Sequence, residues 1–152
     1  MVNFSDAYIE RCDKETENMI KNETGTFLTQ PLNYLNKNKN EFIYLESNWF
    51  EGIGVEAVSL EVDDVFGNYD VMLGLKLQKK FDKTLKEYLN TNLHGNEAKF
   101  DLMFSQDDGL WNLNFALNYV EGFKEEMTLI EAFQVIYKFL NNLVQSVKVG
   151  KS

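Results

Sequence analysis

Apolar residues recur at helical spacing near the C-terminal end of the chain. Thr128 and Glu131 stand at the spacing of a capping box, in which each side chain satisfies a backbone N–H at the start of a helix. This pattern predicts a helix over about 128–148 with a broad apolar face against the core, followed by a frayed tail over 149–152. The recurring residues are Leu129, Phe133, Ile136, Leu140, Leu143 and Val147.

Alternation of apolar and polar residues predicts a hairpin just before that helix. Phe100, Leu102 and Phe104 alternate with less apolar neighbours, and Gln106–Gly109 supplies turn-forming residues. Every second residue from 111 to 119 is large and apolar. One apolar and one polar face are typical of an antiparallel sheet that is covered on a single side, so we expect helices on one face only.

The remaining segments complete the predicted order. Strands are expected over 55–62, 69–77 and 41–46, and helices over 5–22 and 79–93. His94 and Gly95 stand where the second of these helices would end and be capped, and Pro31 is expected to start a short helix that reaches Leu35. The sequence therefore predicts one α+β domain over 1–152. It should contain an antiparallel sheet of about four to five strands with helices packed on one face, and the predicted order of elements is α-(α)-β-β-β-α-β-β-α.

Negative charge is concentrated in the middle of the chain. The formal net charge is −9, and the segment 41–75 contains eight carboxylates and no lysine or arginine. Charge of this kind bears on partners and association rates rather than on the fold. The carboxylates are Glu41, Glu46, Glu51, Glu56, Glu61, Asp63, Asp64 and Asp70.

Several classes of function find no support in the residues. Cys12 and His94 are the only cysteine and histidine, so neither an intramolecular disulfide nor a Cys/His zinc site is expected, and no phosphate loop or other cofactor motif is present. Arg11 is the only arginine, which disfavours direct binding of nucleic acid. No apolar run is long enough to span a membrane, and the first residues lack the features of a signal peptide. The single cysteine favours a reducing compartment, so we expect a cytoplasmic location. Lys76, Lys79, Lys80, Lys83 and Lys86 are expected on the solvated back of the 79–93 helix.

An acidic chain without catalytic motifs is suited to binding another macromolecule. Complementary charge speeds encounter and disfavours wrong partners. Abundant lysine and asparagine with a single arginine indicate an AT-rich bacterial or phage genome. We therefore expect a non-enzymatic immunity protein or antitoxin, an inhibitor that neutralises a basic toxin or nuclease. The expected partner-binding residues are Glu46, Glu51, Glu56, Glu61, Asp63, Asp64 and Asp70 as the charged surface, with Trp49 and Phe50 as anchors.

Two other classes remain open at this point. A metal-assisted hydrolase would use the clustered carboxylates of Asp63, Asp64, Asp70, Asp107 and Asp108, and it predicts stabilisation by divalent cations. A structural subunit would bury an apolar patch in a homodimer, and its association would persist at high salt. Turn-forming aspartates and a solvated acidic surface account for the same residues without any function.

Overall fold

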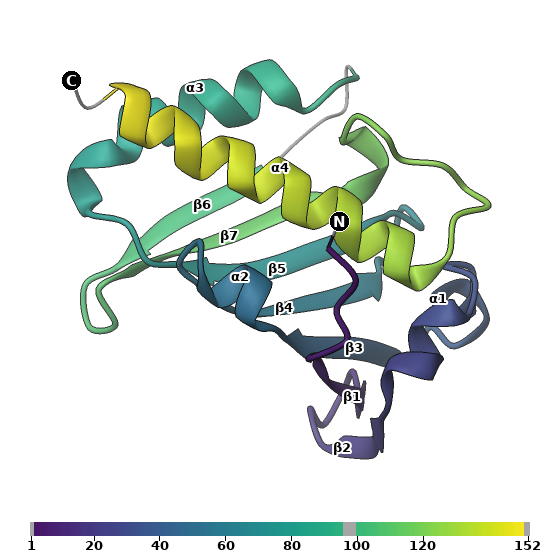
Figure 1. Cartoon of the computed structure of the whole chain (residues 1–152). Helices are drawn as coiled ribbons and strands as arrows, with labels where there is room; N and C mark the ends of the chain where they lie inside the picture. Colours follow the sequence, from purple (N-terminus) through teal and green to yellow (C-terminus); the bar gives the residue numbers. More distant parts are fainter. Residues whose placement is uncertain (1, 96–99, 151–152) are drawn as a thin grey trace.

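Seven antiparallel strands form one sheet in the order β2-β1-β3-β4-β5-β7-β6 (Figure 1). The computed structural model describes residues 2–95 and 100–150. The α+β class and the antiparallel sheet are as predicted. The sheet has seven strands, whereas the sequence predicts about four to five. The strands are β1 Tyr8–Asp13, β2 Met19–Glu23, β3 Glu41–Glu46, β4 Val55–Val62, β5 Tyr69–Leu75, β6 Phe100–Ser105 and β7 Leu110–Ala116.

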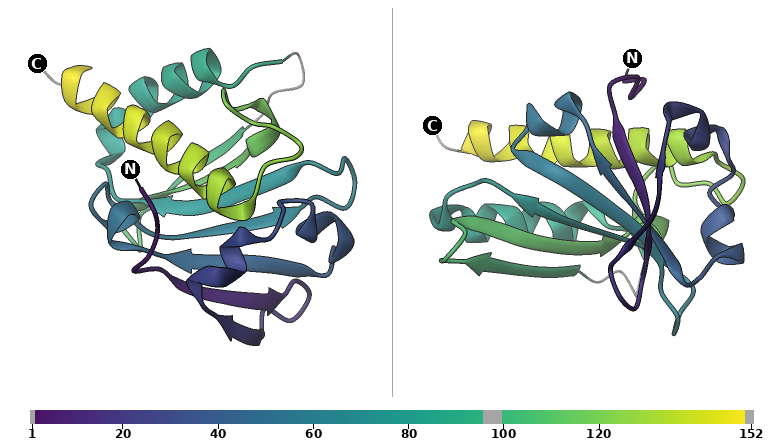
Figure 2. Two further views of the ribbon diagram at one scale, coloured as in Figure 1. Left: turned by 45° about the vertical axis from the view of Figure 1, so that its right-hand side comes forward. Right: turned by 90° about the horizontal axis from the view of Figure 1, so that it is seen from below.

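The long helix α4 crosses one face of this sheet, with α2 on the same side (Figure 2). Helix α3 packs beside α4, and the short helix α1 precedes β3. The core fills the space between this layer and the sheet, and includes Leu73, Leu113, Phe133 and Leu140. The helices are α1 Tyr34–Lys37, α2 Asn48–Glu51, α3 Asp82–Asn92 and α4 Leu129–Gly150, with 3-10 turns at Gly25–Thr29, Lys79–Phe81 and Leu117–Tyr119.

Helix α4 confirms the predicted C-terminal helix and its capping box. Glu131 Oε1 accepts a hydrogen bond from Thr128 N at 3.0 Å, and Thr128 Oγ1 accepts one from Glu131 N at 3.3 Å. The helix continues through Gly150, so residues 149 and 150 are helical and do not form the expected tail. Residues 151–152 of that tail lie outside the described residues. No helix in the described part of the chain is both long and apolar enough to cross a membrane.

The strands predicted over 41–46 and 55–62 are confirmed, and the strand predicted over 69–77 ends at Leu75. The β6–β7 hairpin closes through a hydrogen bond from Gly109 N to Ser105 O of 2.8 Å, with Gly109 at a φ of +67°. Strand β7 ends at Ala116, because the next three residues wind into a 3-10 turn instead of extending the strand to Tyr119.

The N-terminal region departs from prediction, because residues 5–22 form a hairpin and not a helix. A tight turn after β1 reverses the chain: Asp13 Oδ1 accepts hydrogen bonds from Glu15 N and Thr16 N, each 2.9 Å long, and Glu17 follows at a φ of +64°. β1 then lies between β2 and β3, and β2 forms one edge of the sheet. Pairing with two strands outweighs the weak helical pattern of this segment.

Two helix boundaries also differ from prediction. Helix α3 ends at Asn92 with an extended Leu93, so His94 lies beyond the helix and donates its backbone N–H to Tyr119 O at 2.8 Å. Gly95 has a φ of +113° but does not cap the helix. Pro31 forms an isolated bridge with Thr128, and the helix that follows begins only at Tyr34.

Candidate partner-binding surface

The face of the sheet turned away from α4 is covered by no described helix, and we call it the open face (Figure 2). Strand register shows which side chains share it: Glu10 lies opposite Tyr44, Ser59 opposite Met72, and Asn114 opposite both Met72 and Asp101. Six open-face positions on the described strands are carboxylates, and none is lysine or arginine. Strand register places Glu10, Glu46, Glu61, Asp70 and Asp101 there. The sixth, Glu56, lies in the irregular part of β4 between Val55 and Val58, and its charge acts on Tyr44 of the open face.

At one end of the open face, tyrosines and carboxylates form what we call the tyrosine cluster. The hydroxyl of Tyr8 donates to Glu10 Oε2, and the hydroxyl of Tyr44 donates to Glu46 Oε2. The two rings lie edge to face with centroids 6.5 Å apart. Burial, the hydrogen bond to Glu46 and the charges of Glu46, Glu56 and Glu10 raise the pKa of Tyr44. The pKa of Tyr8 is raised as well, first by its hydrogen bond to Glu10, so both hydroxyls are donors at neutral pH.

At the other end lies a second group, the turn cluster of Glu61, Asp63, Asp64 and Asp70. Glu61 and Asp70 are direct cross-strand partners, and like charges in this position destabilise a sheet. Burial, followed by the charges of Asp63 and Glu61, raises the pKa of Asp70 to about 6. Burial likewise raises the pKa of Glu61.

Lys14 is the base that contacts the turn cluster. Its Nζ lies 3.4 Å from Glu61 Oε2 and 3.2 Å from Asp64 Oδ1, and it also donates to the carbonyls of Lys39 and Val62. The carboxylate of Asp70 makes no hydrogen bond or ion pair with any described residue. One lysine thus faces four carboxylates, and it contacts Glu61 and Asp64 but not Asp70.

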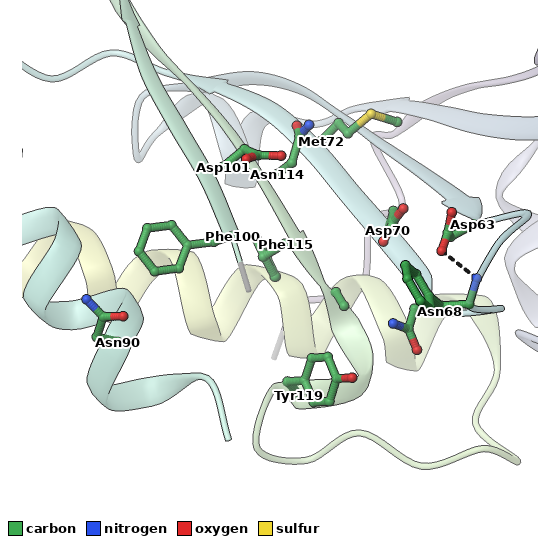
Figure 3. A pocket seen from close by; sticks show the side chains of 12 residues that line it. Asp63, Asn68, Asp70, Met72, Asn90, Phe100, Asp101, Asn114, Phe115 and Tyr119 are labelled. Atoms are coloured by element: carbon green, nitrogen blue, oxygen red, sulfur yellow. Dashed lines mark hydrogen bonds between the residues drawn. The ribbon is translucent and has the colours of Figure 1, made fainter. Parts of the chain in front are cut away.

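A pocket of about 910 Å³ opens beside Asp70 (Figure 3). Carboxylates and carboxamides share its lining with the apolar side chains of Met72, Phe100 and Phe115. Acceptor oxygens of this kind suit cationic groups such as ammonium or guanidinium. The polar lining residues are Asp63, Asn68, Asp70, Asn90, Asp101 and Asn114, with the hydroxyl-bearing Tyr119.

The predicted surface is partly assembled by the fold. Glu46, Glu56, Glu61 and Asp70 lie on the open face, and Asp63 and Asp64 lie in the adjoining β4–β5 turn. Trp49 and Glu51 belong to α2 and therefore lie on the helix-covered side of the sheet.

The prediction that Phe50 is an anchor is wrong, because its side chain is fully buried. Its ring stacks on Phe4 with centroids 5.5 Å apart and meets Tyr137 edge to face at 5.7 Å. Trp49 is 41% exposed and its ring also contacts Tyr137, at 5.8 Å. The segment is a short helix, capped where Ser47 Oγ accepts from Trp49 N at 3.2 Å.

Sequence reasoning missed other residues of this surface. Tyr8 and Glu10 fall within the helix predicted over 5–22, but they lie on β1. Val65 and Phe66, at the tip of the β4–β5 turn, are 78% and 80% exposed. A signal for them exists in the sequence, since two large apolar residues stand between an Asp-Asp pair and Gly67-Asn68, where turn residues are otherwise small or polar.

The aspartates of the metal-assisted hydrolase do not converge. Asp107 and Asp108 lie in the β6–β7 turn, whereas Asp70 lies opposite Ala116 at the far end of β7. The length of that strand separates the two groups by about 20 Å. Within the described residues, no three His, Cys, Asp or Glu side chains are placed to hold a metal ion.

Comparison of the chain with protein-family models, with curated proteins and with solved structures finds no significant match. Function must therefore be inferred from the surface itself.

Proposed function

We propose that this protein is a non-enzymatic inhibitor, of the immunity-protein or antitoxin kind, that binds a basic toxin or nuclease through its open face. The observation that carries the proposal is the composition of this face: six carboxylates and no lysine or arginine at the described strand positions. A field of one sign steers an oppositely charged partner and raises its association rate.

The cost of this arrangement to the fold supports a role in binding. Glu61 and Asp70 repel each other across neighbouring strands, and Asp70 is half-buried without a described partner. A protein selected only for stability would place a base or a neutral residue at one of these positions. A lysine or arginine of a bound protein would supply the missing positive charge, and a charge-assisted hydrogen bond to Asp70 would form only in the complex.

The proposal is tested by retention of proteins from the native cell lysate on the immobilised chain, at low and at high salt. The test variant replaces Glu10, Glu46 and Glu56 with Gln, which removes charge but keeps an acceptor for the tyrosine hydroxyls. The matched control replaces Glu51, Glu87 and Glu126, which are exposed and lie outside the open face. Asp63 is unsuitable for such a test, because its carboxylate holds the β4–β5 turn.

We expect one basic protein to be retained at low salt, and the purified pair to lose affinity as salt rises. The open-face variant should bind more weakly and with a flatter salt dependence, whereas the control should match the unmodified chain. An equal loss in both variants would mean that net charge alone drives retention. Absence of any basic partner would contradict the proposal.

A second candidate rests on one observation, the raised pKa of Asp70 beside a pocket. A carboxyl group with a pKa of about 6 can act as a general acid or base near neutral pH. Under this alternative Asp70→Asn abolishes turnover of a substrate, whereas under the inhibitor proposal it only weakens binding. A melting temperature unchanged by Mg²⁺, Mn²⁺ and Ca²⁺ would remove the metal-assisted form of the alternative.

A further inference from the structure

The tip of the β4–β5 turn, formed by Val65 and Phe66, presents apolar surface to solvent. Phe66 is 80% exposed, more than any other large aromatic side chain in the described part of the chain. Lone exposed apolar residues are ordinary, but here two are adjacent on a protruding turn. Aromatic residues that project in this way are typical anchors of protein interfaces.

The turn is held in one shape by its own hydrogen bonds. Asp63 Oδ1 accepts from Val65 N at 3.3 Å, and Asp63 Oδ2 accepts from Phe66 N at 2.8 Å. Backbone bonds from Asp63 N to Asn68 O at 2.7 Å and from Gly67 N to Asp63 O at 2.9 Å close the loop. Gly67 has a φ of +72°, which other residues adopt at a cost. A pre-formed tip loses little conformational entropy on binding.

Carboxylates surround this apolar tip. Asp64 precedes it and is 70% exposed at its side chain, and Glu61 and Asp70 lie on the strands that the turn connects. Phe66 also lines the pocket beside Asp70. The tip thus combines an apolar centre with an acidic rim.

We propose that Phe66, supported by Val65, is the anchor of the interface and inserts into an apolar pocket of a basic protein whose rim carries lysine or arginine. This inference rests on the proposed function and names the anchoring contact of the same surface. A second copy of the chain fits less well, because a two-fold contact through the tips would bring two turn clusters of equal negative charge together. An anionic membrane would repel the same rim.

The experiment places the photo-crosslinking residue p-benzoylphenylalanine at position 66 and, in a second protein, at position 49. Trp49 is the matched control, since it is an exposed aromatic on the helix-covered side. Both proteins are irradiated in native lysate, the crosslinked protein is identified by mass spectrometry, and it is then purified. Its affinity is measured for the unmodified chain and for the Phe66→Ala, Trp49→Ala and Glu61→Gln/Asp70→Asn variants over a range of salt concentrations.

We expect a basic protein to crosslink at position 66 and not at position 49. Phe66→Ala should weaken binding by about 30-fold or more while leaving the salt dependence unchanged. Glu61→Gln/Asp70→Asn should instead flatten the salt dependence, and Trp49→Ala should change affinity by less than about 3-fold. Circular dichroism on each variant checks that the fold is retained.

The outcomes separate the two proposals. If a basic partner binds with salt-dependent affinity and Phe66→Ala does not weaken it, the anchor is overturned and the inhibitor proposal stands. If no basic partner is found, both fail. Self-association of the pure protein in sedimentation that is lost in Phe66→Ala overturns the anchor in favour of a second copy. Phe66-dependent binding to phosphatidylcholine vesicles that contain phosphatidylglycerol overturns it in favour of a membrane.

Discussion

The two faces of the sheet are built from alternate residues of the same strands, yet they differ in almost every respect. On the covered face, Ile43, Leu45 and Leu60 are fully buried against the helices. One residue further along these strands, Tyr44, Glu46 and Glu61 face the opposite way. Burial of the covered face provides the apolar contacts that stabilise the fold. The open face is therefore free to carry residues that stability alone would not select.

The two faces also differ in whether their carboxylates are paired with a cation. On the covered side, Glu41 is only 7% exposed, but Arg11 Nη1 lies 3.1 Å from its Oε2 and the hydroxyl of Tyr34 donates to its Oε1 at 2.8 Å. On the open face, Asp70 has no such partner among the described residues. A buried charge that is paired is structural, whereas a half-buried charge left unpaired points to a contact outside the chain.

The largest expected effect is a contrast between two phenylalanines. Phe50→Ala removes a fully buried ring from the core and should lower the free energy of unfolding by about 3 to 5 kcal/mol. Phe66→Ala removes an exposed ring and should change it by less than about 0.5 kcal/mol. Urea unfolding followed by circular dichroism measures both values. A large loss in Phe66→Ala would show that the tip is a structural element.

The next effect concerns the charged network of the covered side. Arg11→Met leaves Glu41 and Glu23 without their cation. We expect the free energy of unfolding to fall by about 2 to 3 kcal/mol, since these carboxylates are only partly exposed. Adding Glu41→Gln to that variant should restore part of the loss, because it removes the unpaired charge. Lys14→Met, at the edge of the open face, should lower the free energy of unfolding by about 1 to 2 kcal/mol, because one of its two partners, Asp64, is well exposed, whereas the other, Glu61, is not. A larger loss from Lys14→Met than from Arg11→Met would reverse the comparison.

A pH experiment examines the unpaired charge directly. The pKa of Asp70 is about 6 in the folded protein and about 4 when unfolded, so the folded state binds the proton more tightly. Stability should therefore rise as the pH falls from about 7 to about 5, by about 1 to 2 kcal/mol after allowance for partial exposure. Asp70→Asn should be more stable than the unmodified chain at neutral pH and should lack most of this rise. The control variant Asp101→Asn, at an exposed position of the open face, should show the same rise in stability at low pH as the unmodified chain.

Much of this fold could be predicted from the sequence, and the failures have a common physical cause. Strands and helices that bury one face, such as β7 and α4, leave a clear periodicity. The segment 5–22 does not, because β2 is exposed at almost every position and the turn at Asp13 depends on local side-chain and backbone hydrogen bonds. Edge strands of this kind depend on pairing with distant residues, which a local pattern does not show.

The candidate site could be predicted only in part for a related reason. The acidic segment 41–75 does provide most of the open-face carboxylates, because strands β3, β4 and β5 are neighbours in the sheet. Glu10 and Asp101 come from distant segments, and only the strand order brings them to this surface. The two adjacent aromatics Trp49 and Phe50 looked equivalent in sequence, but on a short helix one ring enters the core and the other remains half-exposed.

The smallest expected effect is the response of stability to salt, and it concerns the whole open face. Carboxylates without nearby cations repel one another, and this repulsion is screened as NaCl rises from about 20 to about 500 mM. We expect the free energy of unfolding to rise by less than about 1 kcal/mol, since most of these groups are solvated. The Glu10→Gln/Glu46→Gln/Glu56→Gln variant should show a smaller rise than the matched Glu51→Gln/Glu87→Gln/Glu126→Gln variant of equal net charge. Equal responses of the two variants would mean that the repulsion comes from the net charge of the molecule. A fall in stability as salt rises would mean that attractive ion pairs outweigh the repulsion. The two faces would then differ in composition but not in their electrostatic contribution to stability.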